Sequence, residues 1–356
     1  YGFTGSWRLA GSGGGIKVEV AELAGTGRME AKGNYYGGGG GRIAVLYGLN
    51  TGFALSNLDA SNGFGAGVGT VFTRSAAQLN GELVLDNRNA GYANPTTPAP
   101  LPTPLPAGSY DRLRIAGGAV VAATGPVTAT VLELQGGVVD FDAFSSPQTS
   151  LVAAGTVANF LDWGFPAGTS VSLTGSSLAA KTPGLLQLGA VTLAGGSTLT
   201  VGATGVTLPS LALTGSSVLT VVPTTASYES KLDLDVTGDV TIDNNSRIDV
   251  TQKGYLGGWK PGNPDARGRT LGNAFGPLNA GGGYGGYGWA LTAVTPIAYG
   301  DFKNPNELGS GGAGSSGSSA AFGGNGGGLV RLKANKLTLN GAILANGEGD
   351  GIYGFT

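Results

Sequence analysis

The acidic residues between positions 233 and 249 are the densest group in this chain that could bind a metal or take part in acid–base chemistry. Asp233 and Asp235 alternate with apolar residues, so a strand over this stretch would turn both carboxylates away from the core. Calcium prefers such oxygen ligands, and catalysis would combine the carboxylates with a basic residue. We favour a solvated outer face and keep Asp233 and Asp235 as calcium candidates. The whole group comprises Asp233, Asp235, Asp239, Asp243 and Asp249, with Lys231 and Arg247 nearby.

The residue types that most enzymes and metal sites require are missing. The chain contains no Cys and no His, which excludes disulfides, thiolate or imidazole zinc sites and nucleophiles activated by a histidine. No Gly run is followed by the Gly-Lys-Ser/Thr of a phosphate-binding loop. A partial match to a calcium-binding nonapeptide at 346–351 is interpreted as a turn, because such sites need successive copies. We therefore expect no catalytic residue, no cofactor and no enzyme activity.

Aromatic residues gather in stretches that are otherwise rich in Gly. Exposed rings there would stack on sugars or on a neighbouring chain, whereas buried rings would clamp Gly-rich loops against the rest of the protein. We favour clamping, with lateral fibre contact and glycan binding as the alternatives. The interaction candidates are Tyr35, Tyr36, Tyr255, Trp259, Tyr284, Tyr287 and Trp289, and Tyr47 belongs to the same group.

Composition indicates a folded, weakly charged protein. Gly accounts for 69 of the 356 residues, but 41% of residues are hydrophobic, with many Val, Ile, Leu and Thr, which disordered chains lack. Only 12% of residues are charged and the net charge is −2, so nothing favours binding to nucleic acid or to an anionic membrane. No apolar run reaches about 18 residues, the length that a membrane-inserted helix needs.

Short repeats dominate the middle of the chain. The pentapeptides VSLTG, VTLAG and LALTG begin 20 residues apart, at 171, 191 and 211, and LRIAG at 113 precedes LELQG at 132. Apolar residues alternate in each as in a strand, and Gly supplies a bend. This period predicts an all-β fold, a parallel β-helix (β-solenoid) with coils of about 20 residues, whereas strands of a β-sandwich need not share a phase. The predicted core includes Leu173, Leu193, Leu213, Ile242 and Leu339.

Two insertions interrupt the predicted coils. The Pro-rich stretch 94–108 should be an extended excursion, because Pro cannot donate to a β-ladder. The stretch 253–324 is too long and too rich in Gly and aromatics for coils throughout, and should be a loop or subdomain. The remaining segments are predicted as solenoid coils: 1–93 continuing from a preceding repeat, 109–252 regular, and 325–356 leading into a next repeat.

The same four residues begin and end the chain. YGFT occupies 1–4 and 353–356, which is a spacing of 352 positions, and the coil-like stretch 337–347 aligns without gaps on 23–33. We therefore expect one period of a tandem array, a segment of a longer polypeptide whose coils run on from residue 356 into residue 1 of the next copy.

Several long stretches resemble the Gly-rich tandem repeats of very large bacterial extracellular surface proteins, the adhesin and fibre proteins with a parallel β-helix. They include DVTIDNNSRIDVTQKGYLGG, AYGDFKNPNELGSGG, GGNGGGLVRLKANKLTLNGAILANG, GSGGGIKVEVAELAGTGRMEAKG, GGGGGRIAVLYG, GTVFTRSAAQLNGELVLDN and YDRLRIAGGAVV. The resemblance covers most of the chain. It implies a secreted, non-enzymatic protein and supplies no catalytic set.

Taken together, the sequence predicts a structural repeat of a giant extracellular fibre on a bacterial cell surface, stacking end to end with a 352-residue period. Expected partners are adjacent copies head to tail, with lateral strands of the fibre or surface glycans as further candidates, and neither nucleic acid nor a membrane interior. A glycan-binding adhesin module using the loop aromatics is the alternative. A carbohydrate-active β-helix enzyme is disfavoured by the missing His and the lack of a convergent carboxylate cluster.

Overall fold

The computed structural model describes residues 10–34, 38–62, 66–89, 102–290, 298–315 and 321–349. These residues form an all-β protein with large parallel sheets and no α-helix. Two single turns of 3-10 helix, η1 (Leu55–Asn57) and η2 (Leu271–Asn273), are the helical exceptions in the described ranges. The chain divides into two compact units, Tyr1–Leu178 and Ala179–Thr356.

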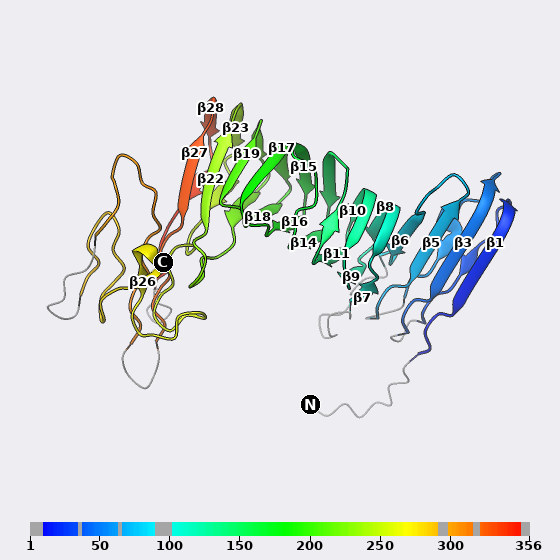
Figure 1. Ribbon diagram of the computed structural model, residues 1–356, viewed down its shortest axis with the longest axis horizontal. Helices are drawn as coiled ribbons and strands as arrows, with labels where there is room; N and C mark the ends of the chain where they lie inside the picture. Colours follow the sequence, from blue (N-terminus) through cyan, green and yellow to red (C-terminus); the bar gives the residue numbers. More distant parts are fainter. Residues whose placement is uncertain are drawn as a thin grey trace. The chain divides into compact units, whose positions relative to one another are not determined.

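Two sheets dominate the first unit (Figure 1). The strands of the longer sheet lie side by side in the order β1 (Gly15–Leu23), β3 (Arg42–Asn50), β5 (Thr70–Ser75), β6 (Glu82–Asp86), β8 (Gly108–Ala116), β10 (Val127–Gln135), β13 (Ser150–Ala154) and β15 (Thr169–Thr174). The second sheet contains β7 (Thr103–Leu105), β9 (Val120–Ala123), β11 (Val138–Phe141) and β14 (Val157–Phe160). Two short pairings accompany them, β2 (Met29–Glu30) with β4 (Leu58–Asp59) and β12 (Phe144–Ser145) with β10.

The second unit repeats this plan. In one sheet the strands follow the order β17 (Leu185–Ala194), β19 (Gly205–Leu208), β22 (Lys231–Val236) and β27 (Leu329–Lys333). A branch of the same sheet starts at β17, which also pairs with β20 (Leu211–Leu213). It continues from β20 to β23 (Asp239–Ile242) and β28 (Lys336–Leu339). The other contains β18 (Thr198–Val201), β21 (Val218–Val221), β24 (Arg247–Asp249) and β29 (Ala342–Leu344). A short antiparallel hairpin joins β25 (Arg269–Thr270) to β26 (Ala274–Phe275), and β16 (Ser177–Ala180) spans the boundary of the two units.

Because the parallel strands pair in register, side chains of the same kind stack on one another from strand to strand. Leu193 lies opposite Leu213, and Leu213 lies opposite Ile242. All three side chains are fully buried, as is Leu173 in the first unit, which confirms these four predicted core positions. We call the set of strands from one turn of the chain a layer. Each buried residue packs against the corresponding residue of the next layer, so columns of apolar side chains run from layer to layer and supply most of the hydrophobic stabilisation.

The prediction that Leu339 is buried is wrong. Leu339 pairs in register with Ile242, so its inward position is correct, but 43% of its surface is exposed. The reason is its place in the stack, because β28 is the last strand in its order among the described residues and no further layer covers it.

Two further departures lie in the first unit. Part of the 94–108 segment, predicted as an excursion, is a paired strand: Thr103–Leu105 form β7, which pairs in parallel with β9. Pro104 is accommodated there because β7 is the outermost strand of its sheet among the described residues, and an edge position does not need the missing N–H. The pairing of β5 with β6 is antiparallel, although the predicted coils are all parallel.

The Gly-rich region of the second unit is a hydrogen-bonded bundle of extended segments, which we call the glycine bundle: 254–258, 266–269, 280–283, 309–314 and 323–328. The segment 309–314 donates in three directions. The N–H groups of Gly309 and Gly312 bond to 323–328, those of Ser310 and Ala313 to 280–283, and those of Gly311 and Gly314 to 266–269. Residues three apart thus share a neighbour, which is the three-residue turn of a polyproline II-type helix.

Gly is required in this bundle because neighbouring backbones approach too closely for a side chain. A Cβ on Gly311 would overlap the carbonyl oxygen of Leu256, and one on Gly326 would overlap that of Gly309. The bundle thereby satisfies backbone donors and acceptors that neither a helix nor a sheet provides for.

Candidate interaction surfaces

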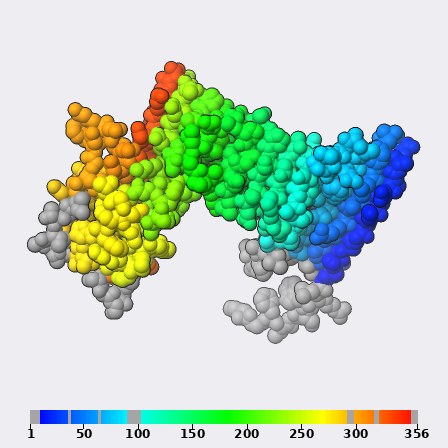
Figure 2. Space-filling view, in the orientation of Figure 1, coloured from blue at the N-terminus to red at the C-terminus, as the bar shows by residue number. Residues whose placement is uncertain are grey.

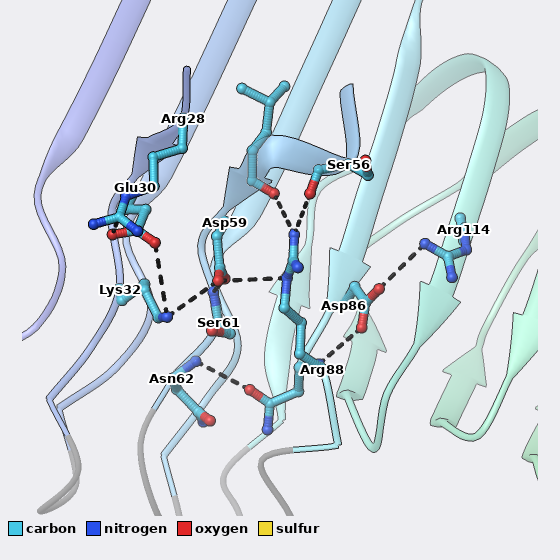
Figure 3. Close-up of polar contacts among 12 residues, drawn as sticks. Arg28, Glu30, Lys32, Ser56, Asp59, Ser61, Asn62, Asp86, Arg88 and Arg114 are labelled. Carbon is cyan, nitrogen blue, oxygen red and sulfur yellow. Dashed lines mark hydrogen bonds and ion pairs between the residues drawn. The ribbon is translucent and has the colours of Figure 1, made fainter. Parts of the chain in front are cut away.

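Opposite charges alternate from layer to layer in the first unit (Figure 3). The Asp59 carboxylate lies between the Lys32 ammonium group at 3.2 Å and the Arg88 guanidinium group at 3.4 Å. Arg88 also donates to the backbone carbonyl oxygens of Ser56 and Leu58. Asp59 belongs to β4 and its two basic partners come from the preceding and following layers, so each layer neutralises the next.

A second column of the same kind lies beside the first. Arg114 contacts Asp86 at 3.2 Å and Glu133 at 3.8 Å. Arg112 pairs with Glu82 at 3.6 Å and with Glu133. The parallel register places these residues on neighbouring strands, so acid and base again alternate along the stack.

The charge on Asp59 is stabilised although its side chain is mostly buried. Burial alone raises the pKa of its carboxyl, but hydrogen bonds from Ser61 and the ion pairs with Lys32 and Arg88 outweigh that cost and hold the pKa below its usual value. Sequence reasoning missed this network, because its members come from layers of unequal length and no short spacing links them.

A cavity of about 360 Å³ lies next to these columns. Leu55, Leu58, Val71 and Val84 form part of its wall, with Asp86, Arg88 and Arg114 also lining it. The charged groups of this lining are already paired with one another or with neighbouring layers, so the cavity presents no uncompensated charge to a ligand.

The predicted calcium candidates lie opposite basic residues. Asp233 contacts Arg331 at 3.4 Å and Asp235 contacts Lys333 at 3.5 Å. Within the described ranges, no group of three or more acidic side chains is placed to hold a metal. Asp243 accepts a hydrogen bond from the Gly215 N–H at 2.6 Å. The carboxylates of the acidic group therefore contact basic side chains or N–H donors of the protein rather than a second carboxylate.

The candidate aromatics divide into clamping and exposed residues. Tyr255 is fully buried, its hydroxyl donates to Glu229 at 2.7 Å, and burial together with that carboxylate raises its pKa. Trp259 is half-buried and its indole N–H donates to the Ser315 carbonyl oxygen at 2.8 Å. Tyr284 is half-buried and packs edge-on against Tyr299. These three are packed against or hydrogen-bonded to other residues of the second unit, and their role as clamps stays a prediction. Tyr35 and Tyr36 lie outside the described residues.

Among the described residues, the exposed aromatic side chains all come from the glycine-rich region. Tyr287 and Trp289 are 73% and 74% exposed. Across the described ranges, every aromatic side chain that is classed as exposed comes from this region: Phe275, Tyr287, Trp289, Phe302 and Phe322. Tyr284, Tyr299 and Phe302 also line a cavity of about 350 Å³.

Besides the charged columns and the exposed aromatics, the first and last layers of the described residues form a candidate interaction surface. The first layer, residues 11–34, contains β1 and β2, and the last layer, residues 325–348, contains β27, β28 and β29. Both lie at the ends of the sheet orders, and their atoms are open at the surface, blue and red in Figure 2. Leu337 and Leu339 of the last layer and Val20 of the first are exposed although they occupy apolar positions. No described strand pairs with the outer edges of these layers.

The chain matches no protein-family model, no curated protein and no solved structure. The described residues contain no helix that is long and apolar enough to cross a membrane.

Proposed function

We propose that this chain is a non-enzymatic structural repeat of a giant extracellular fibre or filament on a bacterial cell surface. In this proposal the parallel sheets are the walls of a β-solenoid, and copies stack head to tail with the 352-residue period of the YGFT repeat. The observation that carries the proposal is the last layer, whose apolar side chains continue the buried columns in register and yet are exposed, with no described strand beyond them.

Stacking another layer on this surface would be favourable for two reasons. It would remove apolar side chains such as that of Leu337 from water, at roughly 25 cal/mol for each Å² of apolar surface buried. It would also pair the open strand edges, which otherwise are templates for unspecific association. A head-to-tail contact of this kind joins unlike surfaces, so it does not close on itself and propagates into a filament.

Composition and resemblance support the extracellular fibre. A chain without Cys or His offers little to catalysis or to zinc. Its Gly-rich segments resemble repeats of large secreted surface proteins, and its core is distributed along the stack rather than gathered around a site. Such a molecule is suited to spanning distance and to presenting the same surface at regular intervals.

Imaging of chains with one, two and three copies in tandem tests this function. We expect each added copy to lengthen the particle by the same amount, with a fixed angle at each junction. Copies that behave as beads on a string, with freely varying angles, would show independent domains and would refute the continuous solenoid.

Glycan binding is the second candidate, and the gathering of the exposed aromatic side chains of the described residues in one region favours it. Trp and Tyr faces stack on sugars, and the cavity beside Tyr284 and Phe302 is within the range of small-ligand pockets. A glycan array probed with the native chain, the Trp289→Ala variant and the Leu79→Ala variant tests this. Leu79 is at least as exposed as Trp289 but lies in the first unit, so only Trp289→Ala should reduce binding.

A further inference from the structure

The first and last layers have the same local structure at a constant separation of 314 positions. The Asn34 N–H donates to the Gly11 carbonyl oxygen at 3.4 Å, and the Glu348 N–H donates to that of Asn325 at 2.8 Å. A Cβ on Gly13 would overlap the Ala31 carbonyl oxygen, and one on Gly327 would overlap that of Ala345. Residues 11–34 and 325–348 therefore correspond one to one, without a gap.

The inward apolar side chains of the two layers also correspond at a separation of 314 positions. Ile16 and Val18 face the core opposite Ile43 and Val45. Their counterparts 314 positions on, Val330 and Leu332, lie opposite the fully buried Leu232 and Leu234. Leu23 corresponds in the same way to Leu337, and Met29 to Ile343. A first layer placed on a last layer in this register would continue four apolar columns.

The charged side chains of the last layer discriminate between registers better than its apolar side chains do. Every charged residue of β27 and β28 is basic, and each lies directly opposite an aspartate of the layer below: Arg331 opposite Asp233, Lys333 opposite Asp235 and Lys336 opposite Asp239. The first layer carries Lys17, Glu19 and Glu22 at the corresponding positions. Its two glutamates would thus meet two lysines, and the acid–base alternation seen in the first unit would continue. Lys17 would face Arg331, one like-charge contact at an exposed position.

Other registers are poorer. A slip by one residue would turn the apolar side chains outward. A slip by two residues in one direction leaves a single opposite-charge contact, Glu19 with Arg331. In the other direction it places Lys17 against Lys333 and leaves both glutamates facing the uncharged Asn335 and Thr338.

We propose that the last layer of one copy binds the first layer of a second copy, with Glu19 and Glu22 of the second copy opposite Lys333 and Lys336 of the first. This inference rests on the proposed head-to-tail function and adds its partner surface and register. The charged columns act here mainly as a register lock, because exposed ion pairs contribute little affinity but like charges oppose wrong alignments.

Disulfide trapping tests the register directly, because the chain has no Cys of its own. Directly opposed residues on neighbouring strands have Cα atoms about 4.8 Å apart, which a disulfide spans. A shift of two residues adds about 6.6 Å along the strand and puts the pair beyond disulfide reach. The Lys333→Cys chain is mixed under mild oxidation with the Glu19→Cys, Lys17→Cys or Ala21→Cys chain, and products are separated without reductant.

We expect a disulfide-linked dimer from Lys333→Cys with Glu19→Cys, and none from the two shifted partners or from Lys333→Cys alone. A charge-reversal pair supplies a second measurement. The Lys333→Glu/Lys336→Glu chain should associate with the native chain about threefold to tenfold more weakly, and mixing it with the Glu19→Lys/Glu22→Lys chain should restore association. Circular dichroism confirms that every variant is folded.

The outcomes separate the two proposals. Association of the native chain combined with trapping at residue 17 or 21 would overturn the register and leave head-to-tail stacking intact. Absence of both association and trapping at all concentrations would overturn stacking and register together.

Discussion

Asp59 is a charged residue of the first unit whose contribution to stability can be tested by a single substitution. It joins Lys32 and Arg88 in one column and is mostly buried. Replacing it by Asn removes the charge and leaves both cations without their shared partner. We expect Asp59→Asn to lower the free energy of unfolding by about 2 kcal/mol, as for hydrogen bonds to charged groups. Urea denaturation measures this, with Asp142→Asn as the control because Asp142 is exposed.

The same residue gives a pH dependence with a defined sign. The pKa of Asp59 is lowered in the folded protein, so its stabilisation is fully present above the ordinary carboxyl pKa and is lost as pH falls through the lower, folded value. The stability difference between the native chain and Asp59→Asn should therefore shrink below about pH 4. A difference that stays constant down to pH 2 would contradict the role of the carboxylate.

Asp233 and Asp235 should respond to salt rather than to chelation. Both lie opposite basic side chains of the last layer, so the stabilising partner is already present in the chain. We expect EDTA to leave the melting temperature unchanged, and added calcium to have no more effect than magnesium at equal ionic strength. A rise of several degrees specific to calcium would revive the calcium-site hypothesis.

At the scale of the element, β17 offers a matched pair of leucines. Leu193 is fully buried, whereas Leu185 in the same strand is 60% exposed. Leu193→Ala should cost about 3 kcal/mol through lost burial and the cavity left behind, and Leu185→Ala less than about 1 kcal/mol. Equal effects in thermal or urea unfolding would mean that the strand faces are assigned the wrong way round.

The glycine bundle offers a matched pair of glycines. A Cβ on Gly311 would overlap the Leu256 carbonyl oxygen, whereas one on Gly285 would meet nothing within 4 Å. Gly311→Ala should therefore loosen the bundle at a cost of about 3 kcal/mol, the upper end for overpacking, and Gly285→Ala should leave it intact. Limited proteolysis reports the loosening, together with the fluorescence of Trp259, whose indole bonds to Ser315. A bundle that tolerates both changes would not need close backbone packing.

At the scale of the whole molecule, hydrogen exchange distinguishes an open end from a covered one. In the single chain, the amides of β28 should exchange faster than those of β23, because β28 has no described neighbour on its outer side. In the first copy of a two-copy chain, β28 should be protected about tenfold more or better, and β23 should be little changed. Unchanged β28 protection would show that the second copy does not cover this layer.

The sequence by itself determined the repeating part of this protein. A period of about 20 residues with alternating apolar positions is a local signal, because parallel in-register stacking reuses the same phase in every layer. Leu173, Leu193, Leu213 and Ile242 were predictable as core for that reason. The same period predicted large parallel sheets in both units.

Only the tertiary structure decided what breaks the repeat. Burial of Leu339 depends on whether a layer follows it, which its own sequence position does not reveal. Pro104 could enter a strand because β7 is the outermost described strand of its sheet, and the Asp59 column joins residues from layers of different length. The glycine bundle has no apolar period at all. Its order comes from backbone hydrogen bonds between segments distant in the chain, in three directions at once, and sequence patterns of side chains carry no record of such bonds.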